Sequence, residues 1–217
     1  MRNKILNRCR ICFSKKLVNY LNLGKQPFSN SFLNYKNIKR EKKFPLMVVL
    51  CQSCGLSQLS IIPNTKFIFS KYDYLSSSSK ALSNHYKKLV EKLVKSYVIS
   101  PVDTVLDIGC NDGSLLDYFR AQGAMTIGVE PTGAFLDAEA KGHITYNNFL
   151  SEKLADAIVD THGKPDFITF TNVFAHKGDL QEVLLPLNYD GCSFFNGKLS
   201  ILFVHGNTLY DRCCTWN

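Results

Sequence analysis

The sequence lacks any apolar run long enough to span a bilayer. Its first ten residues, MRNKILNRCR, also lack the apolar stretch of a secretory signal. We therefore expect a cytoplasmic protein that makes no contact with membranes. Because disulfides are rare in that compartment, the 8 cysteines favour metal binding over a disulfide framework.

Acidic residues are scarce in the first hundred positions, which carry 19 Lys and Arg against three acids and a net charge of +16. The remaining positions carry seven Lys and Arg against fifteen acids, a net charge of −8. A surface this basic attracts nucleic acid, an anionic membrane or a phosphate-bearing small molecule. It can equally be a solvated, lysine-rich surface. Among anionic partners we favour a nucleotide-type small substrate over nucleic acid.

Two CxxC pairs lie in the basic segment, at Cys9/Cys12 and Cys51/Cys54. A CxxC turn places two thiolates on one side of a metal, and two such turns complete a tetrahedral zinc site. The 38 residues between the pairs exceed the usual interval, but lengthening a loop costs little closure entropy. Because four cysteine ligands leave no open position, we expect a structural Zn²⁺. Four free thiols or a redox pair are the alternative.

The length of 217 residues gives room for one ordinary domain and a small one. Short apolar runs predict strands at 43–50 and 56–62, on either side of the second cysteine pair. Apolar residues three and four apart predict an amphipathic helix over 80–98, which Pro101 ends. We expect four segments: a zinc-binding domain 1–62, a connector 63–100, a sheet domain 101–190 and an atypical tail 191–217.

Strand and helix patterns alternate from position 101 onward, which predicts an α/β fold with a parallel sheet and helices on both faces. The predicted strands are 104–109, 125–130, 143–147 and 166–171. The predicted helices are 113–122, 132–141, 151–161 and 178–187. Folds of this Rossmann-like kind bind their ligands at the carboxyl ends of the strands.

The first of these strands leads into an acidic, glycine-containing loop, LDIGCNDG at 106–113. Neither GxGxxG nor GxxxxGK is present, so the loop lacks the pattern that binds a pyrophosphate. The acids Asp107 and Asp112 instead suit a cofactor with a cationic methionine portion. Glu130 follows Gly113 by 17 residues, at the end of the second strand, where an acid holds a ribose diol. A similar domain that binds nothing is the alternative.

Seven stretches of the chain resemble, in order and spacing over about residues 8–181, the zinc-containing sugar C-methyltransferases. They are CRIC at 9–12, LGKQPFSNSFL at 23–33, PLMVVLCQSCGLSQL at 45–59, YDYLSSSS at 72–79, LDIGCNDGSLL at 106–116, GVEPT at 128–132 and NVFAH at 172–176. Members of that family use S-adenosylmethionine to methylate C-3 of a nucleotide-linked, typically TDP-linked, 4-keto-6-deoxysugar. The resemblance implies a small N-terminal zinc-binding domain with four cysteine ligands, followed by a Rossmann-like class I methyltransferase domain.

The resemblance also implies roles for particular residues. The zinc ligands would be Cys9, Cys12, Cys51 and Cys54. The residues around S-adenosylmethionine would be Asp107, Gly109, Asn111, Asp112, Gly113, Glu130, Asn148, Phe149 and Asn172. A tyrosine of the Tyr72/Tyr74 pair would line the reaction centre. His176, which follows the fourth strand, would lie against the sugar as an acid or base, although a structural histidine is an equal alternative.

The last part of the chain departs from the family pattern. Family members are much longer and carry a Tyr-His-Glu-His-type motif that supplies the proposed base, and this sequence has no such motif. We therefore expect a C-terminally truncated or frameshifted form that keeps the zinc and cofactor sites and lacks the proposed base. Alternatively, Asn196-Gly197 predicts a native hairpin of strands 192–196 and 199–204. The other functions left open are a non-catalytic binding module that pairs with a separately encoded C-terminal half, and an RNA-directed methyltransferase.

Overall fold

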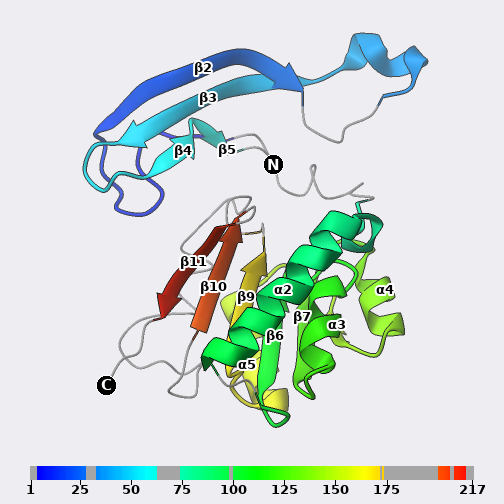
Figure 1. Ribbon diagram of the computed structural model, residues 1–217. Helices are drawn as coiled ribbons and strands as arrows, with labels where there is room; N and C mark the ends of the chain where they lie inside the picture. The colour runs from blue at the N-terminus through cyan, green and yellow to red at the C-terminus, as the bar shows by residue number, and fades with distance from the viewer. Residues whose placement is uncertain are drawn as a thin grey trace. The chain divides into compact units, whose positions relative to one another are not determined.

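The structure is a computed structural model whose described residues are 4–27, 33–62, 74–97, 100–171 and 173, with the backbone of 200–205 and 208–213 (Figure 1). The chain divides into two compact units, with the boundary between Tyr72 and Asp73. None of the helices in the described ranges is long and apolar enough to cross a membrane.

The first unit is built from antiparallel strands. Its main sheet contains β2 (Leu17–Pro27), β3 (Lys43–Cys51) and β4 (Ser57–Leu59), while β1 (Lys4–Ile5) pairs with β5 (Ile61–Ile62) and the 3₁₀ helix η1 (Tyr35–Arg40) precedes β3. β3 confirms the strand predicted at 43–50, and the strand predicted at 56–62 is divided into β4 and β5. Strand β2 was not predicted. Two irregularities in its pairing with β3 interrupt the two-residue alternation by which a strand is recognised.

Few apolar side chains are buried in the first unit. Nearly all of β2 is exposed, and the buried apolar residues among those described are Val49, Ile61 and two cysteines. A hollow of about 300 Å³ adjoins this small core, with Leu17, Met47 and Val49 in its lining. A segment with so small a core needs a cross-link, such as a bound metal, to be stable.

The second unit contains a six-stranded sheet in the order β11-β10-β9-β6-β7-β8. Its strands are β6 (Thr104–Ile108), β7 (Met125–Val129), β8 (Ile144–Tyr146), β9 (Phe167–Thr171), β10 (Ser200–His205) and β11 (Thr208–Cys213). All neighbours are parallel except β10 and β11. The first four strands lie within one residue of their predicted bounds, so the predicted parallel sheet is confirmed.

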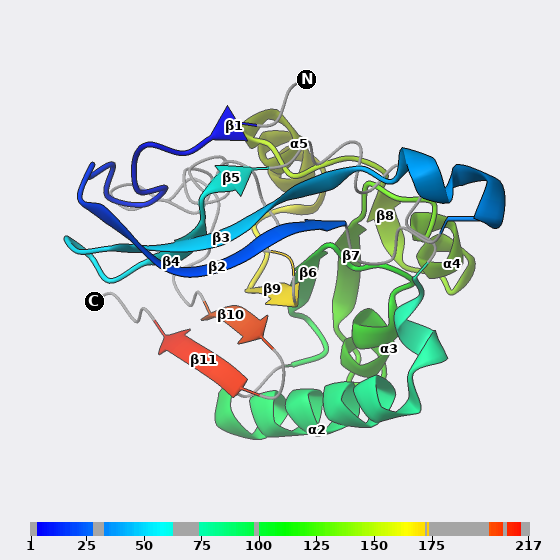
Figure 2. The same ribbon diagram turned by 90° about the horizontal axis from the view of Figure 1, so that it is seen from above.

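Helices cover both faces of this sheet, with α2 (Lys80–Tyr97) and α3 (Ser114–Arg120) on one side and α5 (Glu152–His162) on the other (Figure 2). The 3₁₀ helix η2 (Ser76–Ser78) precedes α2, and α4 (Phe135–Ala140) packs on the side of α3. These elements confirm the helices predicted over 80–98, 113–122, 132–141 and 151–161. The helix predicted over 178–187 lies outside the described residues.

Two apolar clusters join the helices to the sheet. One contains Leu93 of α2 and Phe119 of α3, and the other contains Ile158 of α5 and Leu106 of β6. The helix α2, expected as part of a connector, therefore packs within the second unit. The division of the chain into four segments at the predicted boundaries stays a prediction.

Strands β10 and β11 form a hairpin that extends the sheet beyond β9. The strand predicted at 199–204 is confirmed by β10, while the partner strand predicted at 192–196 and the turn at Asn196-Gly197 lie outside the described residues. Strand β10 has β9 on one side and β11 on the other. Strands β10 and β11 pair antiparallel, from Ser200 opposite Cys213 to His205 opposite Thr208.

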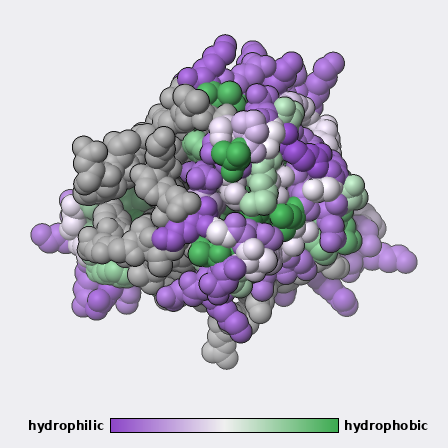
Figure 3. Space-filling model, turned by 90° about the horizontal axis from the view of Figure 1, so that it is seen from below, coloured by the Kyte–Doolittle hydropathy of each residue, from purple (hydrophilic) through white to green (hydrophobic). Residues whose placement is uncertain are grey.

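The coloured part of the face drawn in Figure 3 is mostly hydrophilic, with apolar side chains in small, separate groups. In the second unit, Val102, Met125 and Leu136 are large apolar residues that are exposed. Scattered exposure of this kind is normal for a surface that faces water and needs no special explanation.

Candidate functional site

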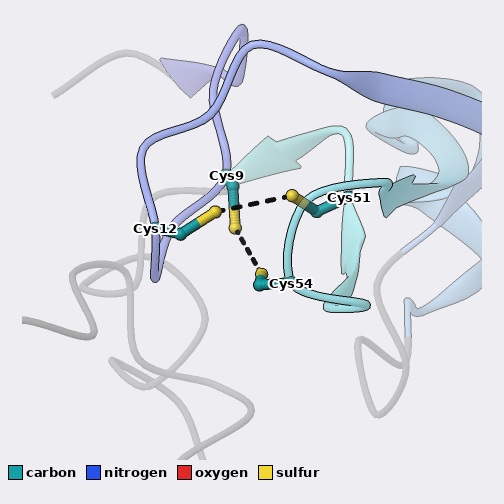
Figure 4. Close-up of side chains that lie close together, drawn as sticks. All are labelled: Cys9, Cys12, Cys51 and Cys54. Atoms are coloured by element: carbon teal, nitrogen blue, oxygen red, sulfur yellow. Dashed lines mark hydrogen bonds between the residues drawn. The ribbon is translucent and has the colours of Figure 1, made fainter.

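The four cysteines of the two CxxC pairs come together in the first unit (Figure 4). Their sulfur atoms all lie within 4.8 Å of one another. Two of the approaches join one pair to the other, Cys9 Sγ to Cys54 Sγ at 3.5 Å and Cys12 Sγ to Cys51 Sγ at 3.6 Å. Cys9 and Cys51 are buried, whereas Cys12 and Cys54 are exposed. The cluster thus ties the start of the chain to the turn between β3 and β4.

Each cysteine pair is followed by a residue with left-handed backbone. Phe13 has a φ of 58° and Gly55 a φ of 76°. The Phe13 amide donates to the Cys9 carbonyl at 3.1 Å, and the Gly55 amide donates to the Cys51 carbonyl at 2.8 Å. The two turns therefore share one hydrogen-bond pattern, which brings the sulfurs of each pair to the same side of the backbone.

Backbone amides favour the charged form of Cys51. Burial alone disfavours its thiolate, but the amides of Cys54 and Ser53 donate to its sulfur and lower its pKa to about 6. In the same turn the Leu56 amide lowers the pKa of Cys54, but the Cys12 thiol and burial outweigh it and raise that pKa to about 12. Because the thiolate and not the thiol binds a metal, Cys51 is the sulfur of this turn whose metal-binding form the amides favour.

Hydrogen bonds outside the sulfur cluster join the two turns. Ser14 Oγ lies 2.7 Å from Ser53 Oγ. The buried side chain of Gln58 accepts from the Arg10 amide at 2.9 Å and donates to the Arg8 carbonyl at 3.2 Å. Sequence reasoning missed Gln58, because a glutamine on a three-residue strand resembles any solvent-facing residue. Its signal is visible only once the strand register is known.

The sulfur positions fit a tetrahedral zinc ion. Zn–S bonds of about 2.3 Å at tetrahedral angles place sulfurs about 3.8 Å apart. The distances of 3.5 and 3.6 Å between the pairs are close to this value. Four thiolates in this geometry are typical of structural zinc and leave no position for water or substrate. The metal would therefore cross-link the first unit and take no part in chemistry.

Two buried carboxyl groups lie at the carboxyl ends of the neighbouring parallel strands β6 and β7. Asp107 of β6 is 2% exposed and accepts a hydrogen bond from Thr169 Oγ1 at 2.6 Å. Glu130, directly after β7, is 5% exposed. Burial raises the pKa of Asp107 to about 7, although the Thr169 hydrogen bond opposes the change, and the charge of Glu130 adds to it. Neither carboxyl group forms an ion pair within the described part of the chain.

Backbone amides hold both oxygens of Glu130. Its Oε2 accepts from the Asn111 amide at 3.0 Å and its Oε1 accepts from the Thr132 amide at 2.8 Å. Asn111 has a φ of 52°, a left-handed conformation that few residues other than glycine adopt. The loop after β6 therefore takes an uncommon backbone shape in which it binds the acid at the end of β7.

The side chains of Asn111 and Asp112 bind the segment that precedes α2. Asn111 Oδ1 accepts from the Ser76 amide at 2.8 Å, and its Nδ2 donates to the Tyr74 carbonyl at 2.9 Å. Asp112 Oδ2 accepts from the Ser77 amide at 2.8 Å. Both residues were predicted as cofactor contacts, and the structure shows that their side chains are engaged by the chain itself.

A buried histidine supports this loop, and the sequence did not identify it. His143 lies between Thr126 Oγ1, 2.8 Å from its Nδ1, and Asp117 Oδ1, 3.1 Å from its Nε2. Burial lowers the pKa of His143, against the effect of Asp117. A Cβ atom on Gly113, whose φ is 75°, would lie 2.7 Å from the His143 ring. Only glycine fits at this point of the loop.

The other predicted cofactor contacts lie at the same edge. Gly109 directly follows β6 and has a φ of 76°, and a Cβ atom there would overlap Val173. Asn148 and Phe149 form the turn after β8, where Asn148 Oδ1 accepts from the Phe149 amide at 2.8 Å. Their roles at a cofactor stay predictions.

The predicted catalytic residues are described only in part. Tyr72 and His176, with the predicted cofactor contact Asn172, lie outside the described residues. Tyr74 is 40% exposed, beside the loop that contains Asn111. The catalytic role of these side chains stays a prediction.

Two family models match the chain. The first, described as a zinc binding domain, matches residues 9–69, which include all four clustered cysteines. The second, described as a methyltransferase domain, matches residues 74–188, more than half of the chain. The parallel sheet with its polar carboxyl edge agrees with the second match, and the chain belongs to the methyltransferase domain family.

One curated relative is the C-methyltransferase NovU from Streptomyces niveus, 28% identical over 181 residues. The match covers 82% of this chain and 43% of NovU, so the chain spans less than half the length of that relative.

Among solved structures, the plantazolicin methyltransferase BpumL in complex with SAH is 18% identical, with a TM-score of 0.46 over 64% of this chain and 55% of that chain. The magnesium protoporphyrin IX methyltransferase ChlM from Synechocystis PCC 6803, with bound SAM, is 18% identical, with a TM-score of 0.44 over 67% of this chain and 70% of that chain. Likeness at this level assigns neither ligands nor site residues.

The zinc assignment can be tested by metal analysis. We expect the purified chain to contain about one zinc ion, and Cys51→Ser to reduce the content to near zero, because a hydroxyl replaces a thiolate ligand. The matched control is Cys110→Ser, which alters a buried free cysteine of the second unit and should leave zinc unchanged. Plasma mass spectrometry measures the metal, and equal zinc in both variants would contradict the assignment.

Asp107 should make the free energy of unfolding depend on pH. Its pKa is about 7 in the folded chain and near 3.8 when unfolded, so the folded state binds the proton more tightly. The stability contributed by the protonated group is present below about pH 4 and is lost as pH rises through about 7. Asp107→Asn keeps an oxygen for the Thr169 hydroxyl, so it should stabilise the second unit at pH 8 by on the order of 1–3 kcal/mol.

Denaturant unfolding at pH 5 and pH 8 measures this effect, and Asp112→Asn is the matched control. Burial opposes ionisation of Asp112, but hydrogen bonds from Ser114 and Ser77 and the charge of Lys141 hold its pKa below its ordinary value. Removal of that charge should therefore destabilise the chain at pH 8. If Asp107→Asn destabilises the chain as much as Asp112→Asn does, the ionised form of Asp107 does not lower the free energy of unfolding and the prediction is wrong.

Proposed function

We propose that the chain binds S-adenosylmethionine at the carboxyl edge of the second sheet and takes part in methyl transfer to carbon. When bound, S-adenosylmethionine supplies an electrophilic methyl group on a sulfonium centre. The observation that carries the proposal is the pair of buried acids, Asp107 and Glu130, on the ends of neighbouring parallel strands. The cofactor presents positive charge and a ribose diol, which suit these two groups. The family match over 74–188 and the likeness to NovU also support the proposal.

The two acids would have different roles. Glu130 would accept hydrogen bonds from the ribose hydroxyls, because each of its oxygens uses one lone pair on a backbone amide and retains another. Asp107 would pair with the ammonium group of the cofactor. That charge would lower the raised pKa of Asp107, so affinity should increase as pH rises through about 7. Asn148 and Phe149 would flank the adenine, and Gly109 would let the ligand approach the backbone.

For the methyl acceptor we propose C-3 of a nucleotide-linked 4-keto-6-deoxysugar. The seven stretches that resemble the sugar C-methyltransferases support this choice. The basic first unit also suits a diphosphate, since its exposed side chains include Lys36, Lys39 and Arg40.

The reaction would begin with removal of the C-3 proton, which is acidic because it is alpha to the ketone. The resulting enolate would attack the methyl carbon as the S–CH₃ bond breaks, and S-adenosylhomocysteine would leave as a neutral thioether. Tyr72, Tyr74 and His176 are the candidates to hold the sugar or move its proton.

The test is an incubation of the zinc-loaded chain with S-adenosylmethionine and a TDP-4-keto-6-deoxysugar, with products analysed by mass spectrometry. We expect a product heavier by one methylene group. Tyr74→Phe should retain cofactor binding and lower the rate about tenfold or more, because the phenol no longer moves or holds a proton. The control Tyr35→Phe changes a tyrosine that is 91% exposed and should have no effect.

Two other outcomes would contradict this proposal and support a different function. Cofactor binding without transfer to the sugar would make this chain a binding module. Transfer to RNA in place of the sugar would favour an RNA-directed methyltransferase, with binding that weakens steeply as salt increases.

A further inference from the structure

The segment Tyr74–Ser79, here called the strap, is fastened to the loop Gly109–Gly113, here called the cofactor loop. The fastening consists of three hydrogen bonds between side chains of the loop and main-chain groups of the strap. Asn111 makes two of them, with the Ser76 amide and the Tyr74 carbonyl, and Asp112 makes the third, with the Ser77 amide. These three contacts use only main-chain groups of the strap, and the bond to the Tyr74 carbonyl positions the backbone of Tyr74 directly. The Ser77 side chain adds a further hydrogen bond to Asp112.

The loop residues depend on the strap in return. Asp112 is 1% exposed, and its other oxygen accepts from the amide and hydroxyl of Ser114 at 3.2 and 2.6 Å. A buried carboxylate is costly unless hydrogen bonds satisfy it, and the Ser77 amide supplies one of these bonds. Asn111 is 9% exposed, and both the oxygen and the nitrogen of its side-chain amide form hydrogen bonds with the strap. Detachment of the strap would remove both of these partners of the Asn111 side chain and the Ser77 amide from Asp112 Oδ2.

The same loop residue joins the strap to the acid at the end of β7. The side chain of Asn111 binds the strap, while its backbone amide donates to Glu130 at 3.0 Å. This double contact requires the left-handed φ of 52°, because the amide and the side chain must face different partners. A ligand held by Glu130 therefore favours the loop conformation that also holds the strap.

We propose that Asn111 and Asp112 are positioning residues that fasten the strap to the cofactor loop, so that cofactor binding and the placement of Tyr74 stabilise each other. This inference rests on the proposed binding of S-adenosylmethionine at Glu130. It assigns these two side chains to the strap and not to the cofactor. Because the coupling is reciprocal, cofactor should tighten the strap, and loosening the strap should weaken cofactor binding.

The test removes a strap amide without changing the loop. Ser76→Pro eliminates the amide that donates to Asn111, and proline suits this position because Ser76 begins η2 and the preceding Leu75 is extended, with φ −108° and ψ 132°. The matched control, Ser76→Ala, keeps the amide and loses only the hydroxyl, which hydrogen-bonds Tyr86. The readouts are hydrogen exchange of the Ser77 amide and calorimetric titration with S-adenosylmethionine.

In the wild-type chain, we expect S-adenosylmethionine to slow exchange of the Ser77 amide. Ser76→Pro should accelerate that exchange and weaken cofactor binding about tenfold, the equivalent of one hydrogen bond to a buried acceptor. Ser76→Ala should bind within about threefold of wild type. Asn111→Gly, which tolerates the left-handed backbone and lacks the side chain, should reproduce the effect of Ser76→Pro.

The outcomes separate the two proposals. If wild type binds the cofactor but Ser77 exchange is unaffected, or if Ser76→Pro binds as tightly as Ser76→Ala, the coupling is wrong and the proposed function stands. If the folded wild-type chain binds no S-adenosylmethionine, the proposed function fails and the coupling fails with it.

Discussion

The second unit depends on the burial of Glu130 between two backbone amides. To donate to this carboxylate, Asn111 adopts a left-handed conformation, and its side chain is then free to bind the segment that precedes α2. Gly113 completes the loop at a point where a Cβ atom would meet the His143 ring. One buried acid thus determines the shape of the loop, and the loop determines where Tyr74 lies. The apolar clusters on the two sheet faces hold the strands, but the polar edge is organised by this acid.

The first unit is stabilised by a cross-link instead of by buried side chains. Its sheet is largely exposed and its apolar core is too small to stabilise it alone, so the four sulfurs replace a core. The thiolates lie on two turns that share one pattern: a residue with left-handed backbone follows each pair, and its amide donates to the carbonyl of the first cysteine. Gln58 hydrogen-bonds the first turn and holds it in place. The metal site is consequently structural. The basic charge of this unit supports the proposal of an anionic substrate.

The sequence predicted the features that depend on local patterns. Alternating apolar runs located β6 to β9, CxxC spacing located the sulfur cluster, and strand order placed Asp107 and Glu130 at one edge. Contacts between segments remote in sequence could not be predicted. Asn111 and Asp112 are of the residue types expected in a cofactor loop. Nothing in the local sequence shows that their side chains hydrogen-bond amides 35 residues earlier in the chain. Strand β10 was located, but its partner was not, because pairing depends on which edges of the sheet are free.

Calorimetric titration of the zinc-loaded chain with S-adenosylmethionine at pH 8, in wild type and in Glu130→Ala, tests the central claim most directly. If the buried acids form a cofactor edge, wild type binds at one site and Glu130→Ala loses that binding while it keeps its zinc. An absence of binding in a wild-type chain whose circular dichroism shows a folded sheet and helices would contradict the account. Equal binding by Glu130→Ala would also contradict it, because the ligand would then lie away from this edge.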